Sequence, residues 1–267
     1  MKTLTRRAAL AGGAAAALGT LASCGVTGGA QAPGQVVSTR PDFGDAAPHP
    51  WSGRRPSDHP VHGIDVARYQ DPLDWRRAQQ AGVSFAFIKA TEGADNVDAA
   101  FREHWNGAGA AGVPRGAYHF YYFCAPAADQ ARNFIRMVPR IPGDLPPVLD
   151  LEWNPFSPTC TWRPPAATVR SEVQIWLDMV ERHFGQSPVI YTAIDFWETN
   201  ELWRLGDYDF WLRSVAADPS ERYANARWVF WQYSSTGLVP GARGEIDLNA
   251  FAGSRAEWAR WLAARRI

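Results

Sequence analysis

From about residue 61 the chain alternates short apolar runs with amphipathic stretches, and this pattern restricts it to few folds. The apolar runs predict strands, and the amphipathic stretches, which end at glycine or proline, predict helices. The predicted strands are 63–66, 84–91, 116–123, 148–152, 188–193, 210–215, 228–233 and 246–251, and the predicted helices are 74–81, 98–111, 127–138, 169–184 and 254–264. Alternating strands and helices form a parallel sheet, and eight strands can close into an α/β barrel. Helices become sparse after the fifth strand.

The composition is compatible with one large globular domain and gives no sign of a highly charged partner. The chain has 267 residues, of which 46 % are apolar, enough for a sizeable core. The formal net charge is zero, so nothing favours nucleic acid as a partner. Thirteen tryptophans is a high number for this length, and aromatic rings can stack on flat apolar surfaces such as sugar rings.

The first 23 residues have the organisation of an export signal. A basic start that includes Arg6 and Arg7 precedes an apolar run over residues 8–22, too short to span a membrane. The arginine pair resembles a twin-arginine signal, although the usual bulky residue after it is missing. Residues 21–24 resemble a bacterial lipobox, in which Cys24 would carry the lipid. The alternative is an ordinary cleaved signal with an unrelated cysteine.

Residues 24–60 are expected to form a flexible tether between this anchor and a domain at 61–267. The tether is rich in Gly, Pro, Ser, Ala and Asp and has no periodic apolar pattern. These features predict an exported lipoprotein, anchored in the membrane and facing the periplasm or cell envelope. If Cys24 is lipidated, Cys124 and Cys160 remain as a possible disulfide pair, which an oxidising compartment would preserve.

Two carboxylates occupy the end of the apolar run at 148–152, which has prolines on both sides. Residues two apart in a strand point to the same side, with backbones about 7 Å apart, so Asp150 and Glu152 are neighbours. Like charges drive two pKa values apart, and glutamate starts from the higher reference pKa, so Glu152 is expected to hold the proton. The alternative is that both side chains lie in solvent where the strand meets a loop.

Two further acids follow the same placement rule. In α/β barrels the functional residues lie at the carboxyl ends of the strands. Asp65 ends the first predicted strand, and Asp247 lies on the last one. Four acids from strands far apart in the sequence are therefore expected to meet at one rim, which is less easily explained by chance than Asp150 and Glu152 alone.

Residues 61–251 resemble the N-acetylmuramidases of glycoside hydrolase family 25, a group of lysozymes. The resemblance is carried by motifs in order at 62–66, 85–93, 115–120, 148–152, 190–192, 231–233 and 246–249. It implies a modified TIM-like barrel, in which five β/α units precede three helix-poor strands. The chain departs from the family pattern at 213–215, after Trp211 and Leu212, and in a longer segment at 153–165.

The resemblance also implies roles for individual residues. Glu152 matches the catalytic acid, Asp150 its partner, and Asp65 and Asp247 the outer acids of the site. The residues that match or adjoin the substrate groove are Tyr118, Tyr191, Gln232, Tyr233 and Trp153. The last of these can either stack on sugar or cover the barrel mouth.

The implied activity is hydrolysis of β-1,4 bonds between N-acetylmuramic acid and N-acetylglucosamine in peptidoglycan, by a monomer without a cofactor. No metal site is expected, because the sequence offers no histidines or cysteines at metal spacing near His119. That histidine is expected to be a hydrogen-bonded core residue. Lys89 and Glu92 are expected either to form an ion pair at the rim or to take part in catalysis. Two alternatives remain open: a non-catalytic cell-wall-binding lipoprotein, and a hydrolase of another N-acetylated glycan such as chitin.

Overall fold

A closed barrel of eight strands forms the centre of the computed structural model, which describes residues 41–267 except 52, 225 and 266. The export signal at 1–23, Cys24 and the tether up to residue 40 lie outside the described residues. Around the barrel the strands follow the order β9, β10, β2, β3, β5, β6, β7, β8, and β8 pairs with β9 to close it. The strands are β2 (His62–Val66), β3 (Val83–Glu92), β5 (Arg115–Phe120), β6 (Val148–Leu151), β7 (Val189–Ala193), β8 (Asp209–Arg213), β9 (Trp228–Leu238) and β10 (Ile246–Phe251).

One barrel strand runs against the others. The pairings from β2 through to β9 are parallel, but β10 is antiparallel to both of its neighbours. The expectation of an all-parallel sheet was therefore wrong for the last strand. A loop rather than a helix joins β9 to β10, and antiparallel strands need no helical crossover.

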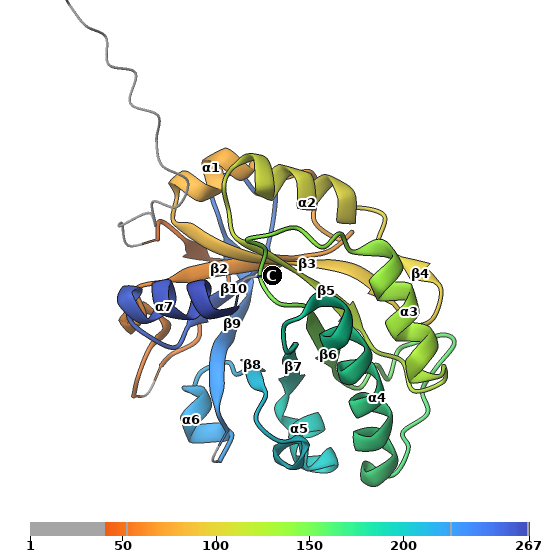
Figure 1. Cartoon of the computed structure of the whole chain (residues 1–267). Coiled ribbons are helices and arrows are strands. Elements are labelled where there is room, and N and C mark those ends of the chain that lie inside the picture. Colours follow the sequence, from red (N-terminus) through yellow and green to blue (C-terminus); the bar gives the residue numbers. More distant parts are fainter. Residues whose placement is uncertain (1–40, 52, 225, 266) are drawn as a thin grey trace, which may run out of the picture. The chain divides into compact units, whose positions relative to one another are not determined.

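Helices surround the first five strands, as Figure 1 shows. They are α1 (Trp75–Gln80), α2 (Phe101–Ala110), α3 (Ala127–Met137), α4 (Ala166–Phe184) and α5 (Ile194–Asn200). After β8 only the one-turn helix α6 (Pro219–Arg222) precedes β9, and α7 (Arg255–Arg265) follows β10. The predicted architecture of five β/α units followed by three helix-poor strands is confirmed.

Local chemistry explains where the helices begin and end. The Asp74 side chain accepts a hydrogen bond from the Arg77 backbone N–H and so caps α1. The last helical residue of α4 is followed by Gly185, whose φ of 74° is the left-handed conformation that glycine adopts at helix ends. The helix expected at 98–111 starts later, at Phe101, because Asp98 accepts a hydrogen bond from the Ala100 N–H just before it and the short strand β4 (Asn96–Val97) pairs with β3.

The lower part of the barrel interior is filled with aromatic rings. Phe85, Phe87 and Phe230 pack against one another with ring centroids 5.0–5.7 Å apart. Trp258 of α7 packs on Phe85, with the two ring centroids 5.4 Å apart, so α7 closes this end of the barrel. Gly63 makes room for this packing, because a Cβ atom there would lie 2.5 Å from the Phe85 ring.

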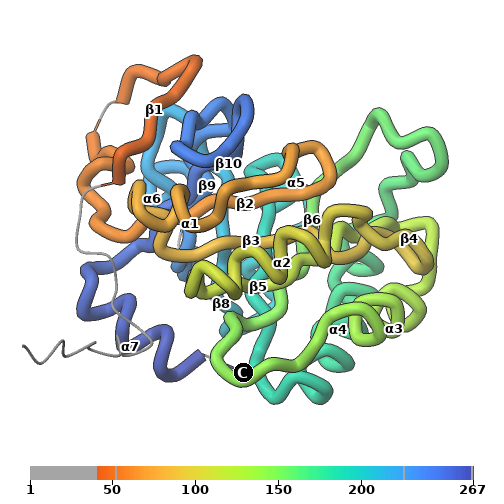
Figure 2. The backbone as a smooth tube through the Cα atoms, turned by 90° about the horizontal axis from the view of Figure 1, so that it is seen from above, coloured from red at the N-terminus to blue at the C-terminus, as the bar shows by residue number. Residues whose placement is uncertain are grey.

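The tether prediction was wrong for residues 41–51 and 53–60, which pack on the barrel. The short strand β1 (Gly44–Asp45) pairs with the far end of β9, as its position beside the β9–β10 region in Figure 2 illustrates. The Asp42 N–H donates to the Ala81 carbonyl, and His59, which is buried, bonds through its ring Nδ1 with the Phe251 carbonyl. Composition alone missed these contacts, because they depend on partners far along the chain.

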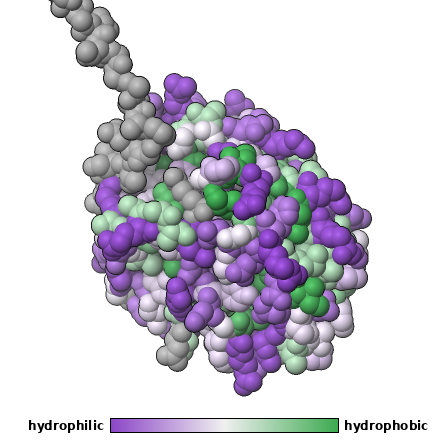
Figure 3. Space-filling model, viewed as in Figure 1, coloured by the Kyte–Doolittle hydropathy of each residue, from purple (hydrophilic) through white to green (hydrophobic). Residues whose placement is uncertain are grey.

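The face of the molecule in Figure 3 intersperses hydrophilic and apolar residues, without a broad apolar surface in view. In the described part of the chain, the helices are all too short or too polar to cross a membrane.

Candidate active site

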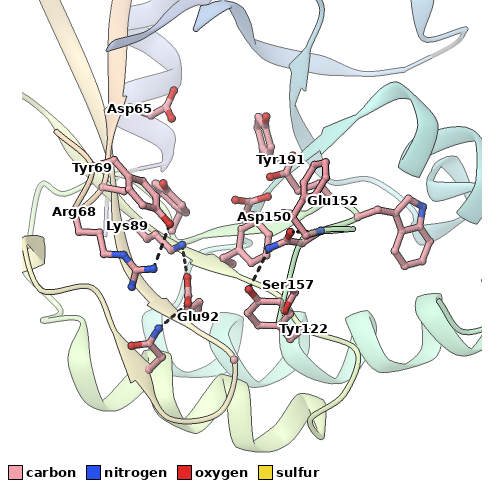
Figure 4. Close-up of a pocket in the computed structure, with 18 of the residues that line it drawn as sticks. Asp65, Arg68, Tyr69, Lys89, Glu92, Tyr122, Asp150, Glu152, Ser157 and Tyr191 are labelled. Atoms are coloured by element: carbon pink, nitrogen blue, oxygen red, sulfur yellow. Dashed lines mark hydrogen bonds and ion pairs between the residues drawn. The ribbon is translucent and has the colours of Figure 1, made fainter. Parts of the chain in front are cut away.

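A cavity of about 950 Å³ opens at the carboxyl ends of the parallel strands, and all four predicted acids line it. Asp65 is on β2, Asp150 is on β6, and Glu152 directly follows β6. Asp247 reaches the same rim although its strand runs the other way, because it lies near the start of β10 rather than at its end. Figure 4 shows three of these acids, Asp65, Asp150 and Glu152, around the open centre of the cavity. The structure therefore brings the four acids together, as expected.

A hydrogen-bond network fixes the orientation of Asp65. Its Oδ2 atom accepts hydrogen bonds from Asn249 Nδ2 at 2.8 Å and Gln232 Nε2 at 3.0 Å. Each amide is held in turn, since Trp211 Nε1 donates to Asn249 Oδ1 and the Tyr191 hydroxyl donates to Gln232 Oε1. Burial raises the pKa of Asp65 to about 6, although both amide hydrogen bonds act to lower it.

Asp150 and Glu152 differ in how deeply they are buried. Asp150 is 6 % exposed, and its Oδ1 atom has no hydrogen-bond partner among the described residues, whereas Glu152 is partly exposed to the cavity. Burial, reinforced by the neighbouring Glu152 carboxylate, raises the pKa of Asp150 well above its usual range. Burial also raises the pKa of Glu152, while the Arg213 guanidinium opposes that rise. Both carboxyls therefore retain protons to a higher pH than two ordinary carboxyls.

Asp247 is the second carboxyl on which the charge of Arg213 acts. Burial, followed by the charge of Asp65, raises the pKa of Asp247 to about 8, and Arg213 again opposes the rise. Arg213 is at the end of β8 and lines the cavity. In the sequence it appeared only as a departure from the family pattern, whereas in the structure its charge acts on both Glu152 and Asp247.

The expected substrate-binding residues fall into two groups. Tyr118, Tyr191 and Gln232 line the cavity, and so does Trp153, which packs on Phe196 with ring centroids 4.5 Å apart. Tyr233 does not line it.

The position of Tyr233 follows from the alternation of side chains along a strand. Its neighbour on β9, Gln232, points into the cavity, so Tyr233 points to the other face. There it is buried, and its hydroxyl bonds with His62 Nδ1 at 3.0 Å. The assignment of Tyr233 to substrate binding is therefore corrected to a structural contact between β9 and β2.

For three other residues, the expectation of a structural role is confirmed. Lys89 and Glu92 form an ion pair in the lining of the cavity, and Asn96 donates a second hydrogen bond to Glu92. His119 is fully buried and hydrogen-bonded to Thr91 Oγ1 and Gln130 Oε1, and burial lowers its pKa to about 4.

A disulfide joins Cys124 to Cys160, with Cα atoms 5.7 Å apart. Cys124 follows β5 and Cys160 lies in the long connection after β6, and these strands are parallel neighbours. The bond thus fastens the 153–165 segment, which forms part of the cavity wall, to the adjacent connection. In the described residues, no group of three or more His, Cys, Asp or Glu side chains is arranged to hold a metal ion.

Three residues of the site were not identified from the sequence: Asn249, Trp211 and Arg213. Asn249 is two residues after Asp247 and so points to the same side of β10, which is a signal that period-two counting can detect. Its contact with Trp211, 38 residues away, depends on the barrel interior and has no local signature.

Comparison with known proteins agrees with this geometry. Residues 64–242 match the family described as Glycosyl hydrolases family 25. The uncharacterized protein YegX of Escherichia coli (strain K12) is 36 % identical over 206 residues, which are 75 % of this chain and 73 % of YegX. Lysozyme M1 of Streptomyces globisporus is 33 % identical over 235 residues, or 83 % of this chain and 76 % of that protein.

The fold also matches solved structures. A family 25 glycosyl hydrolase from Bacillus anthracis superposes with a TM-score of 0.70 at 32 % identity, covering 80 % of this chain and 98 % of the other. The family match extends over most of the described residues and includes the strands that carry Asp65, Asp150 and Glu152. The chain belongs to glycosyl hydrolases family 25.

Proposed function

We propose that the domain hydrolyses the β-1,4 bond between N-acetylmuramic acid and N-acetylglucosamine in peptidoglycan, with Glu152 as the proton donor. The chain is a glycoside hydrolase of the lysozyme type. The observation that carries the assignment of residues is the meeting of four carboxyls, all with raised pKa values, in one cavity of about 950 Å³.

Glycosidic cleavage needs a proton for the leaving oxygen and negative charge beside the developing oxocarbenium ion. Asp150 and Glu152 are close enough to titrate as a pair, so the retained proton belongs to both. Glu152 is the more exposed of the two and can reach a bound sugar, which makes it the donor. As the C–O bond breaks, its electrons go to the leaving oxygen, which takes the Glu152 proton.

Asp150 then supplies the negative charge beside the developing oxocarbenium ion. Positive charge that develops on the sugar favours the ionised form of Asp150, which stabilises it directly or orients the N-acetyl group of the substrate to attack. Asp65 and Asp247 hold the sugar or a water molecule and adjust the pKa of Glu152. Water completes the hydrolysis by adding to the sugar carbon and returning a proton to the site.

The test is product analysis. The domain is incubated with purified peptidoglycan and, separately, with chitin, and the new reducing ends are identified after reduction. The proposal predicts reducing muramic acid from peptidoglycan and much slower release from chitin. Reducing glucosamine from peptidoglycan, or faster cleavage of chitin, would assign a different bond, and binding without cleavage would favour a wall-binding protein.

We also propose that the chain is exported and anchored to the membrane through a lipid on Cys24, where the domain reaches peptidoglycan in the cell envelope. The lipobox-like residues at 21–24 support this proposal. A Cys24→Ser variant of the full chain should move from the membrane fraction to the soluble fraction and lose incorporation of labelled fatty acid. If the wild-type chain stays in the membrane fraction but does not incorporate the labelled fatty acid, lipidation is ruled out.

A further inference from the structure

The cavity continues beyond the four acids into a second region, here called the distal arm. Arg68, Tyr69, Asp95, Asn96, Tyr122 and Phe156 line it. In Figure 4, Arg68 and Tyr69 lie on one side of the cavity and Tyr122 and Ser157 on the other. A substrate bound at the acids can therefore extend into the distal arm.

One wall of the distal arm carries a cation held against an aromatic ring. The Arg68 guanidinium lies 5.2 Å from the centre of the Tyr69 ring, and its Nη2 donates to the Tyr69 hydroxyl at 3.2 Å. Both side chains are exposed, Tyr69 to 72 %. Their backbone is fixed, because Asp98 Oδ2 accepts from the Arg68 N–H and Gln70 Oε1 accepts from the Ala67 N–H. Because the backbone is already fixed, a ligand that binds this pair has to order only the two side chains.

The opposite wall presents an exposed apolar ring. Phe156 is 92 % exposed, although it lines the cavity. Its backbone N–H donates to Asn154 Oδ1, and the Cys160 N–H donates to Ser157 Oγ, so the segment is braced on both sides of Phe156 and tied down by the disulfide. Covering a phenylalanine ring with a ligand is favourable through the hydrophobic effect.

The charges of the distal arm restrict the ligand further. Lys89 and Glu92, which also line the cavity, neutralise each other. Within the described residues, the Arg68 guanidinium donates to the Tyr69 hydroxyl and has no carboxylate within ion-pair distance, although the charges of Glu92 and Asp98 act on it from farther away. Asp95, also exposed, leaves one negative charge in the arm. A sugar can only hydrogen-bond to these two groups through its hydroxyls, whereas a peptide with carboxylate and amino groups can form an ion pair with each of them.

Resting on the proposed function, we propose that the distal arm binds the peptide substituent of the muramic acid, with Arg68 pairing with a peptide carboxylate and Phe156 covering its apolar side chains. The lactyl group of muramic acid carries this peptide beside the bond to be cleaved. A guanidinium suits a carboxylate because its donors can form two parallel hydrogen bonds. The subsite thus makes the enzyme prefer peptide-bearing over peptide-free glycan.

The experiment compares two substrates with the same sugar backbone: intact peptidoglycan fragments, and fragments from which an amidase has removed the peptides. Arg68→Gln is expected to lower kcat/KM about threefold to tenfold on the peptide-bearing substrate and to leave the peptide-free substrate unchanged. The loss should shrink at high salt, since exposed ionic contacts are screened. Arg102→Gln, which alters an exposed arginine of α2 outside the cavity, is the matched control and should change neither rate.

Phe156→Ala is an independent second variant. It should also reduce kcat/KM only on the peptide-bearing substrate, but this loss should not depend on salt. Equal losses on both substrates would overturn the peptide assignment in favour of sugar binding, and unchanged rates for both variants would overturn the subsite altogether. Wild-type protein that cleaves neither substrate would overturn the proposed function itself, and this proposal with it. A specific loss is therefore distinguishable from failure of the underlying activity.

Discussion

Asp65 and Asp247 are direct partners in the antiparallel ladder between β2 and β10, so two carboxyls project into the cavity from adjacent strands. Burial is the main reason why the pKa of Asp247 rises to about 8, and this pairing adds to the rise through the charge of Asp65. The antiparallel direction of β10 makes this arrangement possible. Asp247 is the second residue of β10, and in a parallel strand it would lie at the opposite end of the barrel.

Asp247→Asn should change how stability depends on pH. The folded protein keeps a proton on Asp247 up to about pH 8, whereas the unfolded chain loses it near pH 3.8. Between these values the folded state binds more protons, so this group makes the free energy of unfolding fall as pH rises. The asparagine variant should therefore gain about 1–3 kcal/mol relative to wild type between pH 5 and pH 8.

Urea unfolding at both pH values measures this difference, and Asp207→Asn, at an exposed position, serves as the control. Parallel pH dependences for wild type and Asp247→Asn would contradict the raised pKa.

Asn249→Ala should weaken both stability and activity. The substitution removes a hydrogen bond to Asp65 Oδ2 and leaves the buried Trp211 indole N–H without its acceptor. An unpaired buried donor costs about 1–3 kcal/mol, so the thermal midpoint should fall. Loss of the amide should also raise the pKa of Asp65 above about 6, because this hydrogen bond favours the ionised carboxylate.

Titration of Asp65 by carboxyl-selective NMR would measure that rise, and calorimetry would measure the stability. The account would be wrong on this point if Asp65 titrated at the same pH in the variant and in wild type.

Replacing both Cys124 and Cys160 with serine should destabilise the domain. The disulfide links residues 36 positions apart, and closing a loop of that length stabilises the folded state by about 3–4 kcal/mol in the chain-entropy description. Urea unfolding of the double variant without reductant should give the same free energy as wild type with reductant. Equal stability of the variant and oxidised wild type would show that the bond contributes nothing.

Much of the site was predictable because strand ends are visible in the sequence. Asp150 and Glu152 follow an apolar run bounded by prolines, and Asp65 ends another short run, so barrel geometry alone places them at one rim. Tyr233 shows the limit of this reasoning, since a motif identifies a strand but a shift of one residue reverses the face.

Other features were invisible because they depend on distant partners. The two residues of β1 have no strand pattern of their own and exist because β9 extends to Leu238. Helix α5 starts directly after β7 without an intervening loop, so no turn signal separates it from the strand. The role of Asn249 appears only when Trp211 is placed beside it across the barrel.

The central claim is that Glu152 donates the proton, and Glu152→Gln tests it most directly. The substitution keeps the shape of the side chain and removes the acid, and a positioned general acid typically contributes about 10²–10⁴-fold to the rate. The measurement is kcat on purified peptidoglycan, alongside a pelleting assay for binding and with Glu103→Gln, an exposed position on α2, as the control. The account predicts a fall in kcat of that size with binding and thermal midpoint retained, and turnover close to that of wild type would contradict it.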